Sequence, residues 1–193
     1  MVANVNAQTW NETGDAGSLP ADAQVITAGG ALTNITGNAG GTDSDMYLLQ
    51  VNDAANFRAT TNEPDGGSAT FDTQLWLFDD AVNNQGFHST LLSVATDGSG
   101  QTVPGPGNYY VAISTFGNDP LSAGGEIFNQ VTFTETSGPD GVGGGSPIIG
   151  WDTPGSNGGN AYNILLTGTK GVPEPATLGL LGLGALAMIR RRR

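Results

Sequence analysis

The stretch Thr73-Gln74-Leu75-Trp76-Leu77-Phe78-Asp79 decides the fold class. Its four consecutive apolar residues leave no polar face, whereas a strand with one face in water alternates apolar and polar side chains. No 3.6-residue apolar period runs through it, so a helix is not indicated. We therefore predict a central β-strand over Gln74–Phe78, buried on both faces.

Similar short runs alternate with clusters of Gly, Asn and Asp as far as about residue 136. This spacing of strands and turns is typical of an all-β sandwich or barrel. Apart from the central strand, the predicted strands are Gln24–Thr27, Leu32–Thr36, Met46–Val51, Phe57–Thr61, Tyr109–Ser114, Gln130–Thr134 and Tyr162–Thr167.

Helix is expected to be minor before residue 172. The longest helical candidate, Ser89–Ala95, is long enough for one or two turns only. The composition agrees, because apolar residues make up 37% and charged residues 12% of the chain, with 31 Gly and 10 Pro. Asn, Thr, Ser and Gly therefore supply the polarity, as in β proteins rich in loops. The absence of Cys excludes disulfides and thiolate metal sites.

Residues 137–160 form a Gly-rich segment that we expect to be a long loop, and such loops are functional or loosely ordered. Trp151 within it is the best candidate for an exposed aromatic side chain that stacks on a ligand. Trp76, Tyr109 and Tyr110 could also stack on sugar rings, but their places in predicted strands favour a role in the core.

The charge is strongly asymmetric along the chain. The net charge is −12, with 18 acidic and 6 basic residues, and four of the basic residues are Arg190, Arg191, Arg192 and Arg193. The remaining cations are Arg58 and Lys170. Such an acidic body repels phosphate backbones and attracts divalent cations, so we exclude nucleic acid as a partner.

The tail combines a polar breaker, an apolar run and a basic end. Pro173-Glu174-Pro175 precedes an uncharged run over residues 176–189, and the four arginines follow it. As a helix this run measures about 21 Å, short of a hydrocarbon core of about 30 Å, which suits a temporary span. The arginines act as a membrane stop and stay in the cytoplasm, which places the acidic body on the other side. A soluble amphipathic helix is the alternative, but apolar residues cover all its faces.

Residues 172–193 resemble the PEP-CTERM sorting signal of Gram-negative bacteria. The resemblance implies export, a transient anchor in the inner membrane, and processing near Pro173-Glu174-Pro175 by an exosortase, often in organisms that make exopolysaccharide. Members of that family usually carry a signal peptide. Residues 1–9 contain neither a basic region nor an apolar region, so we expect no signal peptide within them.

Residues 10 to about 135 resemble the bacterial pre-peptidase C-terminal domain, a jelly-roll sandwich similar to collagen-binding modules. Four short pieces carry the resemblance: residues 10–15, 35–37, 42–47 and 107–114. It implies an antiparallel, jelly-roll-like β-sandwich, here over residues 10–169, that binds or assists and does not catalyse.

Related collagen-binding modules hold calcium between acidic segments that correspond here to Glu12, Asp15, Asp43 and Asp45. Carboxylates spaced one residue apart in a Gly-rich turn can also converge with backbone carbonyls on calcium without any appeal to a family. The alternative is that these aspartates cap their own turns. Asp72, Asp79 and Asp80 form a weaker second candidate site.

Catalytic motifs are scarce. His88 is the single histidine, and we expect it to be a surface side chain in a loop. Paired carboxylates could serve a glycosidase, but few cations are available to separate their pKa values. The sequence thus predicts a non-enzymatic surface or matrix protein. The alternatives are a lectin-like module that recognises exopolysaccharide through Trp151, and a hydrolase built on a sandwich.

Overall fold

The computed structural model describes residues 6–27, 29–80, 84–88, 90–92, 101–129, 136–152 and 160–173. Within these ranges the protein is almost entirely strand, and the helical residues described are two single 3-10 turns, at Ala54–Asn56 and Glu63–Asp65. The predicted strand Gln130–Thr134 and the apolar run 176–189 lie outside the described residues.

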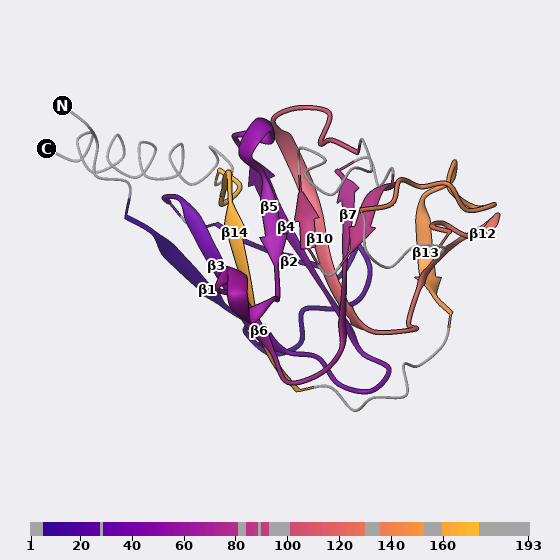
Figure 1. Cartoon of the computed structure of the whole chain (residues 1–193), viewed down its shortest axis with the longest axis horizontal. Coiled ribbons are helices and arrows are strands. Elements are labelled where there is room, and N and C mark those ends of the chain that lie inside the picture. Colours follow the sequence, from indigo (N-terminus) through magenta and orange to yellow (C-terminus); the bar gives the residue numbers. More distant parts are fainter. Residues whose placement is uncertain are drawn as a thin grey trace, which may run out of the picture.

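Two sheets form the body of the molecule (Figure 1). In the first sheet the strand order is β1 (Gln8–Asn11), β3 (Leu32–Asn38), β14 (Ala161–Thr167), β5 (Arg58–Thr60) and β9 (Thr90–Leu92), with β6 (Ser68–Ala69) also paired to β14. In the second the order is β15 (Thr169–Lys170), β4 (Ser44–Val51), β10 (Gly107–Thr115), β7 (Thr73–Asp79) and β8 (Asn84–His88), with β2 (Gln24–Val25) also paired to β4.

The inner faces of the two sheets share one hydrophobic core. Val111 of β10 lies opposite Tyr47 of β4 and Leu77 of β7, so these three side chains form one row across the second sheet. Ile35 and Ile164 of the first sheet, paired with each other, belong to the same cluster. The two sheets therefore pack face to face, and the all-β expectation is confirmed.

A second hydrophobic cluster covers the outer face of the second sheet. Trp76 and Phe78 of β7 contact Phe128, with ring centroids 5.4 and 6.2 Å apart. Above them lies a small third sheet with the order β12 (Gly125–Glu126), β11 (Pro120–Ser122) and β13 (Ile148–Trp151). Figure 1 shows β12 and β13 on the side of β7 away from β14.

The central strand is confirmed at side-chain level. Leu75 and Leu77 point into the core between the two large sheets, while Trp76 and Phe78 point into the outer cluster. All four side chains are buried because a strand sends successive side chains to opposite faces, and both faces are covered here. Residues 75–78 are therefore all apolar because β7 lies in a middle layer, with the first sheet on one side and the outer cluster on the other.

The other predicted strands that fall on described residues are present, with ends that differ by one or two residues. Three expectations were wrong. The helical candidate Ser89–Ala95 contains strand β9, whose three residues pair with β5. The Gly-rich loop 137–160 contains β13, whose residues 148–151 pair with β11. The sheets are mixed rather than purely antiparallel, because β1 runs parallel to β3 and β2 runs parallel to β4.

Candidate metal centre

The segment from Glu12 to Gly17 links the two large sheets at one end of the sandwich. It leaves β1 with the Glu12 amide bonded to the Thr36 carbonyl of the first sheet at 2.8 Å. It reaches the second sheet where the Met46 amide donates to the Gly17 carbonyl at 2.9 Å. This path carries two acidic side chains past the beginning of β4.

Three carboxylates converge at this crossing. Glu12, Asp15 and Asp45 each offer an oxygen, and these oxygens lie within 4.8 Å of one another. Asp43 is outside this group of three but close enough for its negative charge to raise the pKa of Glu12 and of Asp45. The structure therefore brings three of the four predicted metal ligands together and leaves the fourth beside them.

Asp45 is the buried member of the cluster. It belongs to β4 and its side chain is fully buried, so it is not the turn residue that the sequence suggested. Its Oδ2 accepts a hydrogen bond of 2.5 Å from the Tyr162 hydroxyl, which is itself 2.5 Å from the Tyr47 hydroxyl. Its Oδ1 has no hydrogen-bond partner among the described residues. A buried carboxylate oxygen without a partner is costly unless something else satisfies it.

The other carboxylates are held by backbone amides. Glu12 accepts from the Asn38 amide at 2.8 Å and from the Ala16 amide at 3.1 Å. Asp15 accepts from the Gly17 amide at 3.1 Å, and Asp43 from the Ser44 amide at 2.9 Å. These bonds agree with the alternative in which the aspartates cap their turns, but each leaves oxygen lone pairs available.

The electrostatics of the cluster favour bound positive charge. Burial, followed by the charges of Glu12, Asp43 and Asp15, raises the pKa of Asp45 to about 8, although the Tyr162 hydrogen bond acts in the opposite direction. Burial also raises the pKa of Glu12 and of Asp43 above their usual values. These carboxyl groups therefore bind protons more tightly than in water, and a cation held by the same oxygens would compete with those protons.

Gly37 makes room for this arrangement. A Cβ at that position would overlap the Tyr162 hydroxyl and lie 2.7 Å from Glu12 Oε2. Because Gly37 has no side chain, Tyr162 and Glu12 can both reach Asp45; any larger residue at position 37 would collide with them. Tyr162 is a further residue of the site that no local sequence pattern indicates, because it lies 117 positions from Asp45.

The three residues of the second candidate metal site, Asp72, Asp79 and Asp80, do not come together in the structure. Asp72 precedes β7 and Asp79 ends it, so seven residue steps along the strand separate Asp72 from Asp79 by about 23 Å. Asp80 instead accepts a 3.5 Å hydrogen bond from the Asn108 side chain. His88 lies at the end of strand β8, not in a loop as expected.

Trp151 is half-buried on β13 rather than exposed in a loop. Its ring packs edge-on against Trp76 with 6.0 Å between centroids, and its indole N–H donates to the Ser18 carbonyl at 2.8 Å. Trp76 and Tyr109 are buried, as predicted. The exposure expected for Trp151 was therefore wrong, because the outer cluster takes up one of its faces.

The described residues end at Pro173, so Glu174, Pro175 and the arginines at 190–193 lie outside them. No helix in the described part of the chain is long and apolar enough to span a bilayer.

No curated protein and no solved structure matches the chain. Residues 171–193 match the family model described as the PEP-CTERM protein-sorting motif. The chain thus carries the signal of an exported protein that an exosortase sorts from a membrane-anchored precursor.

Proposed function

We propose that this chain is a non-enzymatic surface or extracellular-matrix protein whose β-sandwich is stabilised by calcium after export. Glu12, Asp15 and Asp45 would hold the ion, with Asp43 beside them. The single observation that supports this most strongly is the buried Asp45 Oδ1, which has no hydrogen-bond partner among the described residues and belongs to a cluster of carboxylates.

The donor set favours calcium over other metals. Its side chains supply only oxygen, which suits hard cations, and the chain has no Cys and a single His. Calcium accepts irregular arrangements of six to eight oxygens, whereas magnesium demands a tight octahedron and loses water reluctantly. Three carboxylates from two segments, residues 12–17 and strand β4, match the looser requirement.

A non-enzymatic role fits the burial of Asp45. A buried carboxyl group with a raised pKa is also typical of a general acid, but a general acid must reach its substrate. Asp45 has no exposed surface, and Arg58, one of the two cations before the tail, is paired with Asp65 at 2.6 Å. The cluster is therefore better suited to holding an ion than to proton transfer.

The more specific parts of the proposal rest on the resemblance of the body to the pre-peptidase C-terminal domain. We extend it to a jelly-roll-like sandwich that binds a partner or has a structural role in exopolysaccharide or biofilm. The crossing of residues 12–17 between the sheets supports the first part, since an ion there would tie both sheets together. A pull-down of the mature protein with purified exopolysaccharide tests the second.

Thermal melting tests the calcium site. Extracellular calcium modules bind with Kd of about 10⁻⁴ to 10⁻³ M, so 10 mM calcium should stabilise the fold by roughly 1.4 to 2.7 kcal/mol. We expect the melting temperature of the EDTA-treated protein to rise by several degrees with calcium.

Magnesium at equal concentration is the control, because any divalent ion screens an acidic protein. The double variant Asp15→Asn with Asp45→Asn should lose the part of the shift that is specific to calcium. Equal shifts with calcium and magnesium, or an unchanged calcium shift in the double variant, would show that there is no specific site.

A further inference from the structure

The folded body continues to the first residue of the sorting motif. Thr169 and Lys170 form β15, which pairs with Val51 and Gln50 of β4. The buried Thr169 hydroxyl donates to the Leu32 carbonyl at 2.8 Å, and the Val172 amide donates to the Ile26 carbonyl at 2.7 Å. Pro173 follows at once, so no flexible spacer separates the body from the motif.

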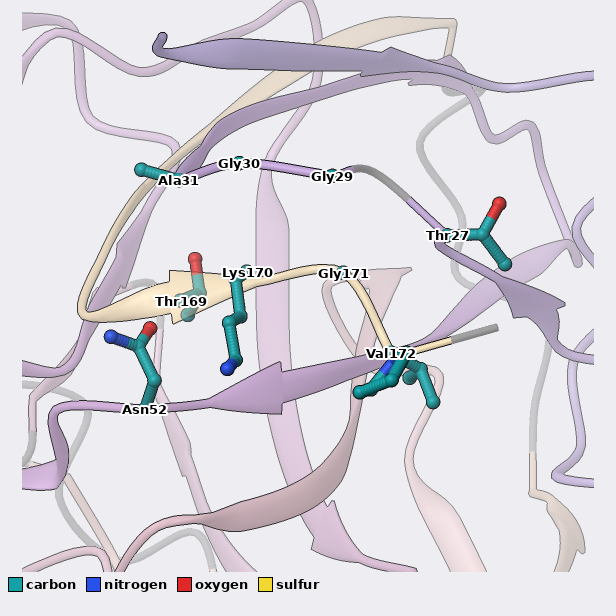
Figure 2. A pocket seen from close by; sticks show the side chains of 10 residues that line it. Thr27, Gly29, Gly30, Ala31, Asn52, Thr169, Lys170, Gly171 and Val172 are labelled. Atoms are coloured by element: carbon teal, nitrogen blue, oxygen red, sulfur yellow. The ribbon is translucent and has the colours of Figure 1, made fainter. Parts of the chain in front are cut away.

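A pocket of about 500 Å³ lies at this exit. Figure 2 shows two segments that line it, Gly29–Ala31 and Thr169–Val172, which are paired at Ala31 and Lys170; Pro173 also lines it. The lining consists mainly of small residues. A Cβ built on Gly29 meets no heavy atom of the described residues within 4 Å, so these residues leave space beside this glycine.

Lys170 gives the pocket a charge that is rare in this protein. Residues 1–169 contain 17 acidic side chains and a single basic one, Arg58. Arg58 is paired with Asp65, whereas Lys170 forms no salt bridge with any residue that the structure describes. Lys170 of β15 and Asn52, which follows the last residue of β4, both line the pocket (Figure 2). An ammonium group offers three hydrogen-bond donors and no acceptor, so the lining suits an occupant with a carboxylate.

The position of the pocket identifies its occupant. The three residues Pro173-Glu174-Pro175 span at most about 10 Å even when fully extended. An enzyme that binds this motif must therefore also touch the surface from which the motif emerges, and that surface is the pocket. We infer that the pocket is a second docking site for the exosortase, which inserts a segment with an acidic side chain against Lys170 and Asn52.

This inference rests on exosortase sorting and adds that the enzyme also recognises the folded body. A surface pair between charged groups contributes modestly, so Lys170→Glu, which turns attraction into repulsion, should slow processing about 5- to 10-fold. Gly29→Leu, which fills the pocket, should slow it at least about 10-fold by excluding the inserted segment.

The experiment is a pulse-chase of precursor and mature forms of the full chain in cells that contain the exosortase. Gly150→Leu is the matched control, because a Cβ on Gly150 likewise meets no atom of the part of the chain that the structure describes, and Gly150 lies on β13 of the third sheet. Each variant is purified and melted first. If Gly29→Leu lowers the melting temperature, the smaller Gly29→Ala and Lys170→Glu decide the question.

Slower processing of Gly29→Leu and Lys170→Glu, with Gly150→Leu like wild type, supports the docking site. Wild-type rates for both, while replacement of Pro173-Glu174-Pro175 by Ala blocks processing, overturn the docking site and leave exosortase sorting intact. Normal processing of that Ala variant contradicts exosortase sorting itself. The assay is repeated with purified enzyme in neutral detergent. If the defect of Lys170→Glu disappears there, Lys170 acts on anionic lipid, and the inference is wrong.

Discussion

Asp45 shows at the scale of one residue how the fold creates an unusual group. Its carboxyl is buried on β4, bonded to Tyr162 through one oxygen and without a partner among the described residues at the other. Burial raises its pKa to about 8, from an ordinary value of 3.8. The folded protein therefore binds a proton at Asp45 more tightly than the unfolded chain does.

This difference predicts a pH dependence for the calcium-free protein. A raised pKa in the folded state means that the stability is fully present below about pH 4 and is lost as the pH rises towards about 8. The slope is at most about 1.4 kcal/mol per pH unit from this group, and Glu12 and Asp43 act in the same direction. In EDTA, chemical unfolding should give a lower free energy of unfolding at pH 8 than at pH 5.5.

Asp45→Asn serves as the control for that measurement. The amide carries no charge, so the variant in EDTA should be more stable than wild type at pH 8 and should vary less between pH 5.5 and pH 8. The Asp65 carboxyl, whose pKa Arg58 lowers, acts only below about pH 4 and does not interfere. A wild-type protein that gains stability towards pH 8 without calcium would contradict this account.

At the scale of elements, the third layer explains two features that a plain sandwich would leave unexplained. Strand β7 is apolar on both faces because the outer cluster covers Trp76 and Phe78. The Gly-rich segment folds closely against that layer, and a Cβ on Gly141 would lie 2.5 Å from the Glu126 carbonyl oxygen. Glycine is thus needed there for close packing of backbone rather than for flexibility.

Trp151 provides the test of this layer. Trp151→Ala removes the contact with Trp76 and the hydrogen bond to Ser18, and we expect a loss of about 2 to 3 kcal/mol in the free energy of unfolding. Ile149→Ala on the same strand is the control, since that side chain is 61% exposed and its loss should change stability by about 0.5 kcal/mol or less. If Trp151→Ala melts like wild type but loses binding to a glycan panel, Trp151 is a ligand residue and not a packing residue.

At the scale of the whole molecule, the candidate metal centre and the residue that begins strand β15, Thr169, lie at opposite ends of β4. Asp45 is near one end of β4, and Val51, which pairs with Thr169, is at the other. The six residue steps between them correspond to about 20 Å. Calcium binding should stabilise the body both before and after processing, because the ion is held by residues of the body.

Processing itself should depend on the motif. We expect that replacement of Pro173-Glu174-Pro175 by Ala leaves the precursor uncleaved in the membrane fraction, because the motif lies just outside the apolar run, within reach of a membrane enzyme. Mass spectrometry of the mature product checks this. An identical mature mass in variant and wild type would disprove the role of the motif.

Local patterns in the sequence were sufficient for the longer strands and for the sorting signal. Alternation of side chains and the Gly-rich turns placed β3, β4, β7, β10 and β14 correctly, because these strands bury at least one face. Short strands such as β1 and β13 were missed, since four residues with mixed polarity carry no clear period. The same holds for β9, whose three residues are strand only because β5 supplies their hydrogen bonds.

The sequence by itself determined an all-β body, its acidic charge, a set of clustered aspartates and the export signal, since each of these is local or a sum over residues. Tertiary structure alone decided which acids meet. It joined Glu12 to Asp45 across the two sheets, added Tyr162 from 117 positions away, and dispersed Asp72 and Asp79 along a strand. It also placed the pocket beside Pro173. The physical reason is that strand pairing and face-to-face packing depend on contacts between distant segments, which no local pattern contains.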